Sequence, residues 1–390
     1  MRIAIPIHSF EPGGVERVAL RLAEQWQADG HEVVIVLGRD RGRCRGDAPA
    51  LDYRMRPEPM RTDAWETPWM VWCLFQFLLR ERVDVLFCPG NTYTIVSWAM
   101  KLLLGDRCPP VLVKISNDLR RRDLPGPVRP LYRLWLKHQG ALLDRFVALA
   151  EPMEPELVEE LEVPHWQVAV IPDPALSNAE LARLAPCGEA HTDAAEGCHY
   201  LSIGRLSAQK NQALLLAAFA AHARAGDRLV IAGEGPARAD LEQRIAALGL
   251  SGRVTLAGHV DDVAPLLAAA DVFVLSSDYE GVPAAVLEAL AAGLPLVATE
   301  CCASMAWLAG EGRFGITVPT GDVAALGKAM VRARKLHPDR EAMRRFAARF
   351  TLESSSGLYL AEMDRMVLRH RLEREAKRAR PARDWRTRSI

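Results

Sequence analysis

Two cations follow a predicted strand in the second half of the chain. Arg205 and Lys210 come directly after the apolar run 199–203, in the segment Gly-Arg-Leu-Ser-Ala-Gln-Lys. Ligands of doubly wound sheets bind beyond the carboxyl ends of the strands, so both side chains can reach one site. Arginine supplies a fork of N–H donors and lysine a point charge, which together suit a diphosphate. A strand-end Arg and Lys are also common as solvated residues, so the pair alone does not decide.

Two glutamates accompany a tight turn further along the chain. Glu280 lies in the turn after the predicted strand 272–275, and Glu288 lies on the helix that follows. Gly281 permits close backbone approach, and Pro283 stands where a first helical residue would be. This turn directs a helix N-terminus, which binds anions, toward the same region. Each glutamate could accept from sugar hydroxyls or simply be solvated.

Alternating strand and helix patterns predict the sheets that position these residues. In the first half, apolar runs at 2–7 and 32–37 flank a helical pattern at 15–29, and 83–88, 111–115 and 145–149 read as later strands. Such βαβ units build doubly wound parallel sheets. A second series follows, with strands at 199–203, 228–232, 254–257, 272–275, 295–298 and 315–318 and helices at 212–224 and 237–248.

The predicted fold class is therefore α/β, with two Rossmann-like halves divided near Ile171-Pro-Asp-Pro174, where two prolines favour extended backbone. One large α/β domain is the alternative. Residues 177–197 lack periodicity and are predicted to form a polar surface segment.

Composition excludes several classes of protein. The 390 residues include 49 Lys plus Arg and 49 Asp plus Glu, so no overall field favours nucleic acid. The most apolar run, 69–79, is shorter than the roughly 20 residues that span a bilayer. Eight cysteines show no zinc-binding spacing and no apolar leader is evident. We therefore expect reduced thiols in a cytoplasmic protein, with contact to the inner face of the membrane left open.

The two motifs together resemble those of glycosyltransferase family 4, which comprises retaining sugar-nucleotide transferases of the GT-B architecture. The family pattern G-R-L-x-x-x-K matches 204–210, and E-G-x-P-x-x-x-x-E matches 280–288. The resemblance covers residues 1 to about 365 and includes Gly13-Gly14-Val-Glu-Arg, Gly233-x-Gly-Pro236, Gly258-His-Val260 and Gly321-Asp322.

This resemblance implies a domain organisation with a central cleft. It gives an acceptor domain at 1–173, a nucleotide-sugar donor domain at 174–352, a helix at 353–370 that returns to the first domain, and a basic tail at 371–390. It also implies transfer of a sugar from a nucleotide-diphosphate donor to a glycan or lipid-linked acceptor. Bacterial cell-envelope, polysaccharide or lipopolysaccharide biosynthesis is the setting that family habit suggests.

Site roles follow from the same resemblance. Arg205, Lys210 and Glu280 would be the catalytic residues: the two cations would bind the donor diphosphate, and Glu280 would contact the transferred sugar. Glu288 would accept from the ribose, and the backbone around Val260 would meet the base. The remaining donor-binding residues would be Gly13, Gly14, Gly204, Gly233, Gly281, Val282 and Pro283.

Charge development suggests the mechanism. Fixed cations and a helix N-terminus would stabilise the departing diphosphate, and no D-x-D triplet occurs. We expect a metal-independent hexosyltransferase with no cofactor beyond its UDP- or GDP-linked donor. In a retaining reaction the acceptor would attack from the face that the diphosphate leaves, and Glu280 is not assigned as a nucleophile.

One position departs from the family. Many relatives carry a histidine near residue 115 that touches the donor sugar, whereas this chain reads Lys114-Ile-Ser-Asn117-Asp118. Asn117 or Asp118 is expected to substitute as the sugar or acceptor contact. Val282 and Ala284 also differ from the aromatic residue and asparagine common in relatives, which leaves the donor sugar open.

Aromatic and basic residues suggest where an acceptor or a lipid surface could bind. Residues 62–104 are rich in large apolar groups, and 120–138 contain six basic residues and one acidic residue. These features suit an anionic membrane interface or a phosphorylated lipid acceptor, or else buried helix faces with solvated arginines. The basic segment 365–388 could be a disordered solvated tail, a contact with a membrane surface or, as the least favoured alternative, a contact with nucleic acid. No nucleic-acid partner is expected.

Other functions remain as alternatives. A sugar-nucleotide epimerase on the same fold would need no acceptor, and a non-catalytic sugar-nucleotide-binding protein would retain the fold without turnover. A nicotinamide-dependent oxidoreductase is disfavoured, because the first turn reads Pro12-Gly-Gly14 and not G-x-G-x-x-G.

Overall fold

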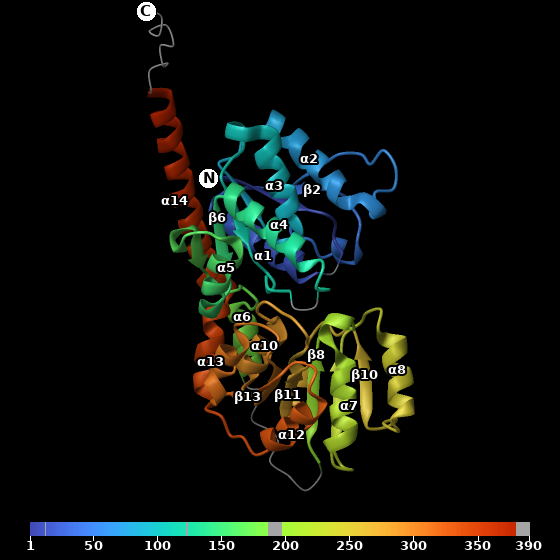
Figure 1. Cartoon of the computed structure of the whole chain (residues 1–390). Coiled ribbons are helices and arrows are strands. Elements are labelled where there is room, and N and C mark those ends of the chain that lie inside the picture. Colours follow the sequence, from blue (N-terminus) through green and yellow to red (C-terminus); the bar gives the residue numbers. More distant parts are fainter. Residues whose placement is uncertain (12, 122–123, 186–196, 380–390) are drawn as a thin grey trace, which may run out of the picture. The chain divides into compact units, whose positions relative to one another are not determined.

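The computed structural model describes residues 1–11, 13–121, 124–185 and 197–379. Within these ranges the chain forms two compact α/β units, each containing parallel strands (Figure 1). Among the described residues, one unit comprises 1–114, 142–146 and 357–379, and the other comprises 115–141 and 147–356. The two α/β halves that the sequence predicts are confirmed.

The first sheet, within the described residues, has the strand order β3-β2-β1-β4-β5-β6-β7. The order reverses at β1, which pairs in parallel with β2 on one side and β4 on the other. Strand β1 is buried from Ile3 to Ile7, as expected for a strand covered on both faces. The strands are β1 (Arg2–Ile7), β2 (Glu32–Leu37), β3 (Asp52–Met55), β4 (Val85–Cys88), β5 (Val111–Lys114), β6 (Arg145–Ala148) and β7 (Val168–Val170).

Three helices, α1 (Gly14–Ala28), α2 (Glu66–Arg80) and α3 (Thr94–Leu104), belong to the first unit. Helix α1 buries a face that includes Trp26, at the spacing expected of an amphipathic helix. On α2 the aromatic residues divide, because Trp69 and Phe77 are buried while Trp72 is half exposed. The aromatic segment of the sequence is therefore core in part and surface in part.

The last helix, α14 (Leu352–Ala379), joins the first unit from Gly357 onward. The Tyr359 ring lies 5.6 Å from the Phe87 ring, and Arg371 forms an ion pair of 2.9 Å with Asp84. The helix continues past residue 370, so residues 371–379 of the predicted basic tail are helical. Residues 380–390 lie outside the described residues.

In the second unit, the described strands form a sheet of order β10-β9-β8-β11-β12-β13, with parallel pairing throughout. Its order reverses between β8 and β11, since β9 and β10 follow on one side and β12 and β13 on the other. These strands are β8 (His199–Ile203), β9 (Arg228–Ala232), β10 (Val254–Gly258), β11 (Val272–Leu275), β12 (Leu296–Thr299) and β13 (Gly315–Val318). All six agree with the sequence prediction to within one residue.

The helices of the second unit are numbered in chain order. Figure 1 shows α7 and α12 beside its strands. The helices are α4 (Arg129–Leu142, whose last residue is grouped with the first unit), α5 (Glu154–Leu161), α6 (Asn178–Leu184), α7 (Gln212–His222), α8 (Arg238–Ala247), α9 (Ala264–Ala268), α10 (Ala284–Ala292), α11 (Met305–Leu308), α12 (Val323–Ala333) and α13 (Arg340–Ala347).

Helix α6 replaces part of the predicted polar surface segment. Ser177 accepts a hydrogen bond from the Glu180 N–H at 3.1 Å, and the Glu180 carboxylate accepts from the Ser177 N–H at 2.6 Å. This reciprocal capping box satisfies two helix-end donors, and the S-x-x-E spacing was its sequence signal. Residues 186–196 of the same segment lie outside the described residues.

The division into units differs from the predicted boundary at residue 173, because 115–141 and 147–173 group with the second unit. One reason is a direct backbone link, in which the Asp118 N–H donates to the Glu280 carbonyl at 3.1 Å. Strands β3 and β7 were not predicted. Both are short strands at the ends of the sheet order, and neither has a fully buried apolar run.

The described cysteines are free thiols, as expected from the sequence. Burial raises the pKa of the Cys73 thiol to about 11 and that of Cys88 to about 12. Cys44 is exposed, so the expectation of core cysteines does not hold at that position. Cys187 lies outside the described residues.

Candidate functional site

The two sequence motifs meet at the reversal point of the second sheet. Residues 204–210 follow β8 and residues 276–283 follow β11, and these two strands pair in parallel with Tyr200 opposite Val272. Parallel strands end at one edge, and the chains leaving a reversal point diverge, which opens a crevice where ligands of such folds bind. The topology therefore brings together the residues that the motifs singled out.

The centre of the site is an ion pair between Lys210 and Glu280. The Lys210 Nζ donates to Glu280 Oε1 at 2.5 Å, and the Ser277 hydroxyl donates to the same oxygen at 2.7 Å. Glu280 is 6% exposed, whereas the Lys210 side chain keeps 20% exposure. A buried carboxylate requires such partners, because desolvation without them costs several kcal/mol. The pair thus fixes Glu280 while leaving part of the ammonium accessible.

Backbone and amide contacts hold the two motif loops together. The Asp278 N–H donates to the Gln209 carbonyl at 2.8 Å, and Gln209 Nε2 donates to the Tyr279 carbonyl at 2.9 Å. Asn211 Nδ2 donates to Asp278 Oδ1 at 2.9 Å. The positions of Lys210 and Glu280 are therefore set by the loops themselves and not only by their mutual attraction.

Arg205 differs from Lys210 in that no carboxylate of the described residues neutralises it. Its side chain is exposed, and no ion pair joins it to a described residue. Its carbonyl accepts from Gln212 Nε2 at 3.0 Å, so the backbone is held at the start of α7. A fixed backbone carrying an unneutralised guanidinium is suited to binding an anion.

Gly233 allows the loop after β9 to pack directly on the loop after β8. Its φ is +142°, and a Cβ there would lie 2.0 Å from the Gly204 carbonyl oxygen. A Cβ on Gly235 would similarly lie 2.2 Å from the Leu206 carbonyl oxygen. A glycine is therefore needed at position 233 because the loop that carries Arg205 packs directly against it. Its predicted contact with the donor stays a prediction.

Residues 116–118 lie against the glutamate turn, close to where the histidine of family relatives was expected. A Cβ on Gly281 would lie 2.3 Å from the Ser116 carbonyl oxygen and 3.2 Å from the Asn117 Cα. The Asp118 N–H donates to the Glu280 carbonyl at 3.1 Å. The structure therefore brings Asn117 and Asp118 beside Glu280 and Gly281. Whether either contacts a sugar stays a prediction.

Helix α10 begins one residue later than predicted, because Pro283 is its N-cap with φ −73° and ψ 116°. The first-turn N–H groups at Ala284 and Ala285 have no partner within the helix, and this end of a helix favours negative charge. Val282 is buried at the turn, and Glu288 is half-buried on α10. Glu288 also has a polar or electrostatic contact within the protein, and its predicted contact with the ribose stays a prediction.

The remaining predicted residues lie at two separate places. Val260 follows β10 and is half-buried at the same carboxyl edge of the second sheet. Gly13 and Gly14 belong to the first unit, where Gly13 precedes α1 in extended backbone with φ −140°. Their approach to the donor stays a prediction.

Sequence reasoning missed three residues that shape the site. Asn211 adopts the left-handed region with φ 44° and caps α7 through its side chain, a common role for asparagine before a helix. Ser277 holds Glu280, and nothing in its local pattern indicated this. Glu156, on α5, accepts from the Leu119 N–H at 2.7 Å, and only the fold brings it near residue 118.

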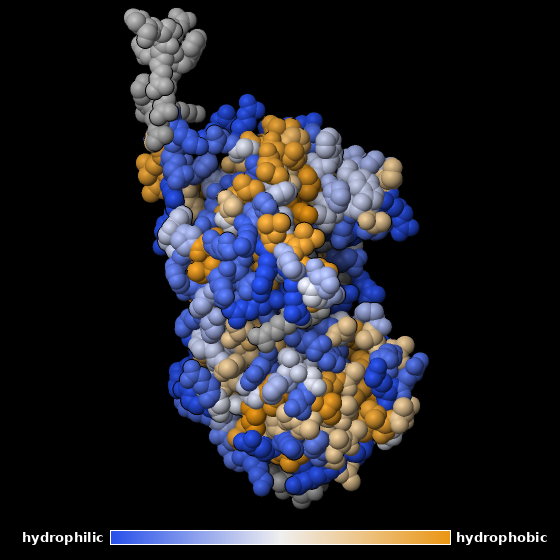
Figure 2. Space-filling model, in the orientation of Figure 1, coloured by the Kyte–Doolittle hydropathy of each residue, from blue (hydrophilic) through white to orange (hydrophobic). Residues whose placement is uncertain are grey.

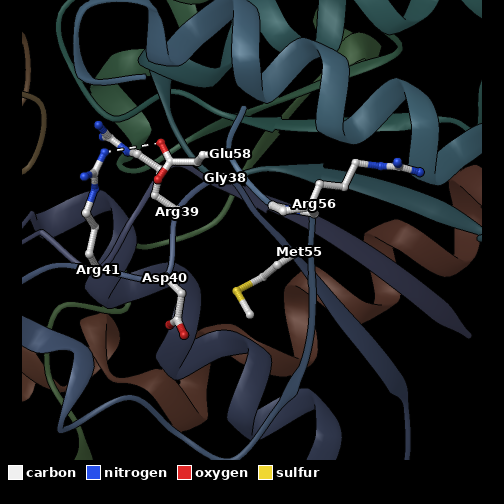
Figure 3. A pocket seen from close by; sticks show the side chains of 8 residues that line it. Gly38, Arg39, Asp40, Arg41, Met55, Arg56 and Glu58 are labelled. Carbon is white, nitrogen blue, oxygen red and sulfur yellow. Dashed lines mark hydrogen bonds and ion pairs between the residues drawn. The ribbon is translucent and has the colours of Figure 1, made fainter. Parts of the chain in front are cut away.

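A hollow of about 450 Å³ lies in the first unit, beyond β2 and β3 and apart from the two motifs (Figure 3). Its arginines are mostly paired: Arg41 contacts Glu58 at 3.2 Å, and Arg39 contacts Glu66 at 2.5 Å. Figure 3 shows Arg56 extending away from that cluster. The hollow is lined by Gly38, Arg39, Asp40, Arg41, Met55, Arg56, Pro57 and Glu58.

The described residues bear on metal binding and on membrane insertion. In that part of the chain no three His, Cys, Asp or Glu side chains are grouped to hold a metal ion, and metal independence stays a prediction. None of its helices has both the length and the apolar character needed to cross a bilayer.

Two family models match the chain. Residues 12–174 match Glycosyltransferase Family 4, and residues 197–335 match Glycosyl transferases group 1. Among curated proteins, a lipopolysaccharide core biosynthesis glycosyltransferase of Rhizobium meliloti is 37% identical over 130 residues, which are 33% of this chain and 37% of the relative. An Escherichia coli UDP-Gal:alpha-D-GlcNAc-diphosphoundecaprenol alpha-1,3-galactosyltransferase is 27% identical over 238 residues, 57% of this chain and 59% of the relative.

These matches thus span about a third to three fifths of the curated relatives' own lengths. Anabaena HepE, solved in complex with UDP, superposes with a TM-score of 0.68 at 16% identity and covers 93% of this chain and 100% of its own. That likeness shows the fold, and the GT-B architecture is confirmed. With one family model matched by each half of a GT-B chain, the protein belongs to the family 4, group 1 glycosyltransferases.

Proposed function

We propose that the protein is a retaining glycosyltransferase that moves a sugar from a UDP- or GDP-linked donor to a glycan or lipid-linked acceptor. The observation that carries the proposal is the arrangement at the reversal point of the second sheet. There Arg205, which no ion pair joins to a described residue, and Lys210, whose side chain is 20% exposed, follow β8, and helix α10 follows the paired strand β11. Three positive features at one edge suit the two phosphates of a sugar nucleotide.

The relatives support the class of substrates. The Escherichia coli relative is named for a UDP-linked sugar and a diphosphoundecaprenol acceptor, and the Rhizobium relative for lipopolysaccharide core biosynthesis. HepE was solved with UDP bound. These relatives support the proposal that this protein acts in bacterial cell-envelope or polysaccharide assembly, and we propose that it does so on the cytoplasmic side of the membrane.

Each residue has a stated task in the proposed reaction. As the bond between sugar and diphosphate breaks, Arg205, Lys210 and the first-turn N–H groups of α10 would stabilise the charge on the leaving group. Glu280 would accept from hydroxyls of the transferred sugar through the carboxylate oxygen that Lys210 leaves available, and Glu288 from the ribose. A phosphate oxygen would take the acceptor proton, so the proposal needs neither a metal nor another cofactor.

A thermal-shift panel of nucleoside diphosphates and sugar nucleotides tests the donor site. We expect the nucleotides of one base to raise the melting temperature of the wild type, since a ligand of the folded state stabilises it by mass action. Arg205→Ala should lose that shift and Arg56→Ala, the matched control in the first unit, should keep it. Failure of every nucleotide to shift the wild type would overturn the donor site.

Product analysis then separates transfer from the two alternative functions. With the donor found, we expect release of nucleoside diphosphate to depend on an added lipid-linked or glycan acceptor. Conversion of the donor sugar without acceptor would instead identify an epimerase. Tight donor binding with no turnover across acceptors would identify a non-catalytic binding protein.

Peripheral membrane contact is part of the proposal. Apolar side chains on α2 and α3 of the first unit are exposed by 44% to 56%, and Figure 2 shows apolar residues gathered on the face over α3. The basic residues of α4 are partly neutralised, since Lys137 pairs with Glu162 at 2.7 Å. The apolar set, and not net charge, therefore supports lipid contact. Its members are Trp72, Leu79, Ile95, Leu102 and Leu103.

Sedimentation with phospholipid vesicles tests this contact. We expect the wild type to sediment with vesicles and the double variant Leu102→Ser/Leu103→Ser to remain largely in the supernatant, because apolar burial supplies the attraction. Equal sedimentation of the two proteins would contradict it.

A further inference from the structure

A carboxyl pair lies behind the glutamate turn, in which Glu156, a residue given no role above, meets Asp118, one of the two candidate sugar contacts. Glu156, on α5, is 5% exposed, and its Oε1 accepts from the Leu119 N–H at 2.7 Å. Its carboxyl group is hydrogen-bonded to that of Asp118. Asp118 Oδ1 also accepts from the Arg120 N–H at 2.8 Å. Two carboxyl groups that share a hydrogen bond require a proton on one of them, because two carboxylates have no hydrogen to donate and repel each other.

The pair is connected to the candidate site through the backbone. The Asp118 N–H donates to the Glu280 carbonyl, and the Ser116 carbonyl lies directly behind Gly281. Segment 116–119 is therefore held on one side by Glu156 and on the other by the glutamate turn. A change in the charge of the pair would alter how this segment supports Glu280.

We propose that Glu156 is a positioning residue whose protonated carboxyl donates to the Asp118 carboxylate and so holds segment 116–119 against the Glu280–Gly281 turn. The proposal rests on the proposed function in one respect, namely that this turn contacts the donor sugar. Glu156 itself touches no substrate. It acts through Asp118 and the backbone.

Burial and the neighbouring charges agree with a protonated group near neutral pH. Desolvation, followed by the hydrogen bond and charge of Asp118, raises the pKa of Glu156 to about 8, against the opposing Leu119 N–H and Arg120. Arg120 offsets little of this, since it also pairs with Glu159 at 2.6 Å and Glu160 at 3.4 Å. Across the segment, the carboxylate of Glu280 is already bound by Lys210 and Ser277.

The raised pKa of Glu156 has two consequences. Above about pH 8 the group ionises, the two carboxylates repel each other, and support of the turn is lost. Because the folded state keeps a proton that the unfolded state releases near its ordinary pKa of about 4.3, stability falls as pH rises between these values. The activity effect requires a donor, whereas the stability effect does not.

The test compares Glu156→Gln, Glu156→Ala and a matched control, Glu159→Gln, which removes an exposed carboxylate from the same helix. Glutamine keeps a donor for Asp118 and an acceptor for the Leu119 N–H but does not titrate. We expect wild type and Glu159→Gln to lose kcat/KM for the donor above about pH 8, and Glu156→Gln to keep neutral activity without that loss. Glu156→Ala should lose about 10–100-fold at neutral pH through misplacement of the turn.

Melting temperatures across the same pH series provide a readout without substrate. The wild type should lose stability between about pH 5 and pH 8, and Glu156→Gln should lose less. An unchanged pH profile of both activity and melting in Glu156→Gln would overturn the inference. If no donor is ever turned over but the melting difference appears, the carboxyl pair stands and the proposed function fails. Circular dichroism of each variant establishes that it is folded.

Discussion

Cations at the carboxyl edges of the two sheets differ in whether carboxylates neutralise them. Beyond β2 of the first sheet, Arg39 and Arg41 are paired with carboxylates, including Asp63 at 2.9 Å from Arg39. Beyond β8 of the second, Lys210 is paired but Arg205 is not paired with any described residue. Paired arginines fix the shape of a loop, whereas an unpaired arginine on a fixed backbone is available to an anion. Similar topology therefore does not imply similar function. Whether the cations at the sheet edge are paired with carboxylates is the better guide.

Removing Lys210 is expected to have the largest effect. Lys210→Ala leaves the buried Glu280 carboxylate without a cation, and we expect a loss of about 3–5 kcal/mol in the free energy of unfolding. Urea denaturation measures it. The double variant Lys210→Met/Glu280→Gln should recover much of the loss, because no buried charge remains. A loss below about 1 kcal/mol in the single variant would show that the pair behaves like an exposed one.

Removing Arg205 should separate function from stability. We expect Arg205→Ala to lower kcat by about 10²–10³-fold, as for other groups that stabilise developing negative charge. Its unfolding free energy should stay within about 0.5 kcal/mol of the wild type, because the exposed side chain has no ion-pair partner among the described residues. Steady-state kinetics and denaturation of one preparation check both. If the loss in unfolding free energy were as large as the rise in the activation free energy of the reaction, Arg205 would support the fold, as Arg39 and Arg41 do, and would have no specific role in the reaction.

Gly281→Ala tests the close approach of segment 116–118. The added Cβ would meet the Ser116 carbonyl oxygen at 2.3 Å, and backbone cannot move aside easily. We expect a cost of about 1–3 kcal/mol in unfolding free energy, with weaker donor binding. Gly46→Ala is the control, since its φ is −67° and no atom lies within 4 Å of the new Cβ. An equal effect of the two substitutions would contradict the contact.

Arg56→Ala should have the smallest effect. Arg56 extends away from the paired cluster in the first unit (Figure 3), and its removal should change unfolding free energy by no more than about 0.5 kcal/mol. Nucleotide binding should be unchanged in a thermal-shift assay. A loss of nucleotide binding in this variant would indicate that the anion binds in the first unit, and the contrast between the two sheets would then be wrong.

The sequence predicted the residues whose local pattern carries their chemistry. Strand ends, the glycine turns and the two charged motifs were all visible, because parallel strands buried on both faces read as apolar runs bounded by glycine. The pairing of Lys210 with Glu280 was not visible, since it depends on β8 and β11 being neighbours although 70 residues separate the two side chains.

The contacts that hold the site residues in place could not be predicted for the same reason. Ser277 had no signal in its local pattern, and Asn211 had only the general preference of asparagine for helix N-termini. Glu156 reaches Asp118 from α5, 38 positions away. The short strand β3 was missed because its pattern is half exposed, and α6 because a capping box was overlooked in a polar segment. Local physics thus predicted the elements and the candidate residues, while the topology decided which of them meet.

Calorimetric titration of wild type and Arg205→Ala, each with a nucleoside diphosphate and with the matching nucleoside, tests the central claim most directly. The account predicts that the wild type binds the diphosphate far more tightly than the nucleoside, and that Arg205→Ala weakens diphosphate binding while leaving nucleoside binding unchanged. Equal binding of the diphosphate by both proteins would contradict it, because the unpaired guanidinium would then have no part in holding the phosphates.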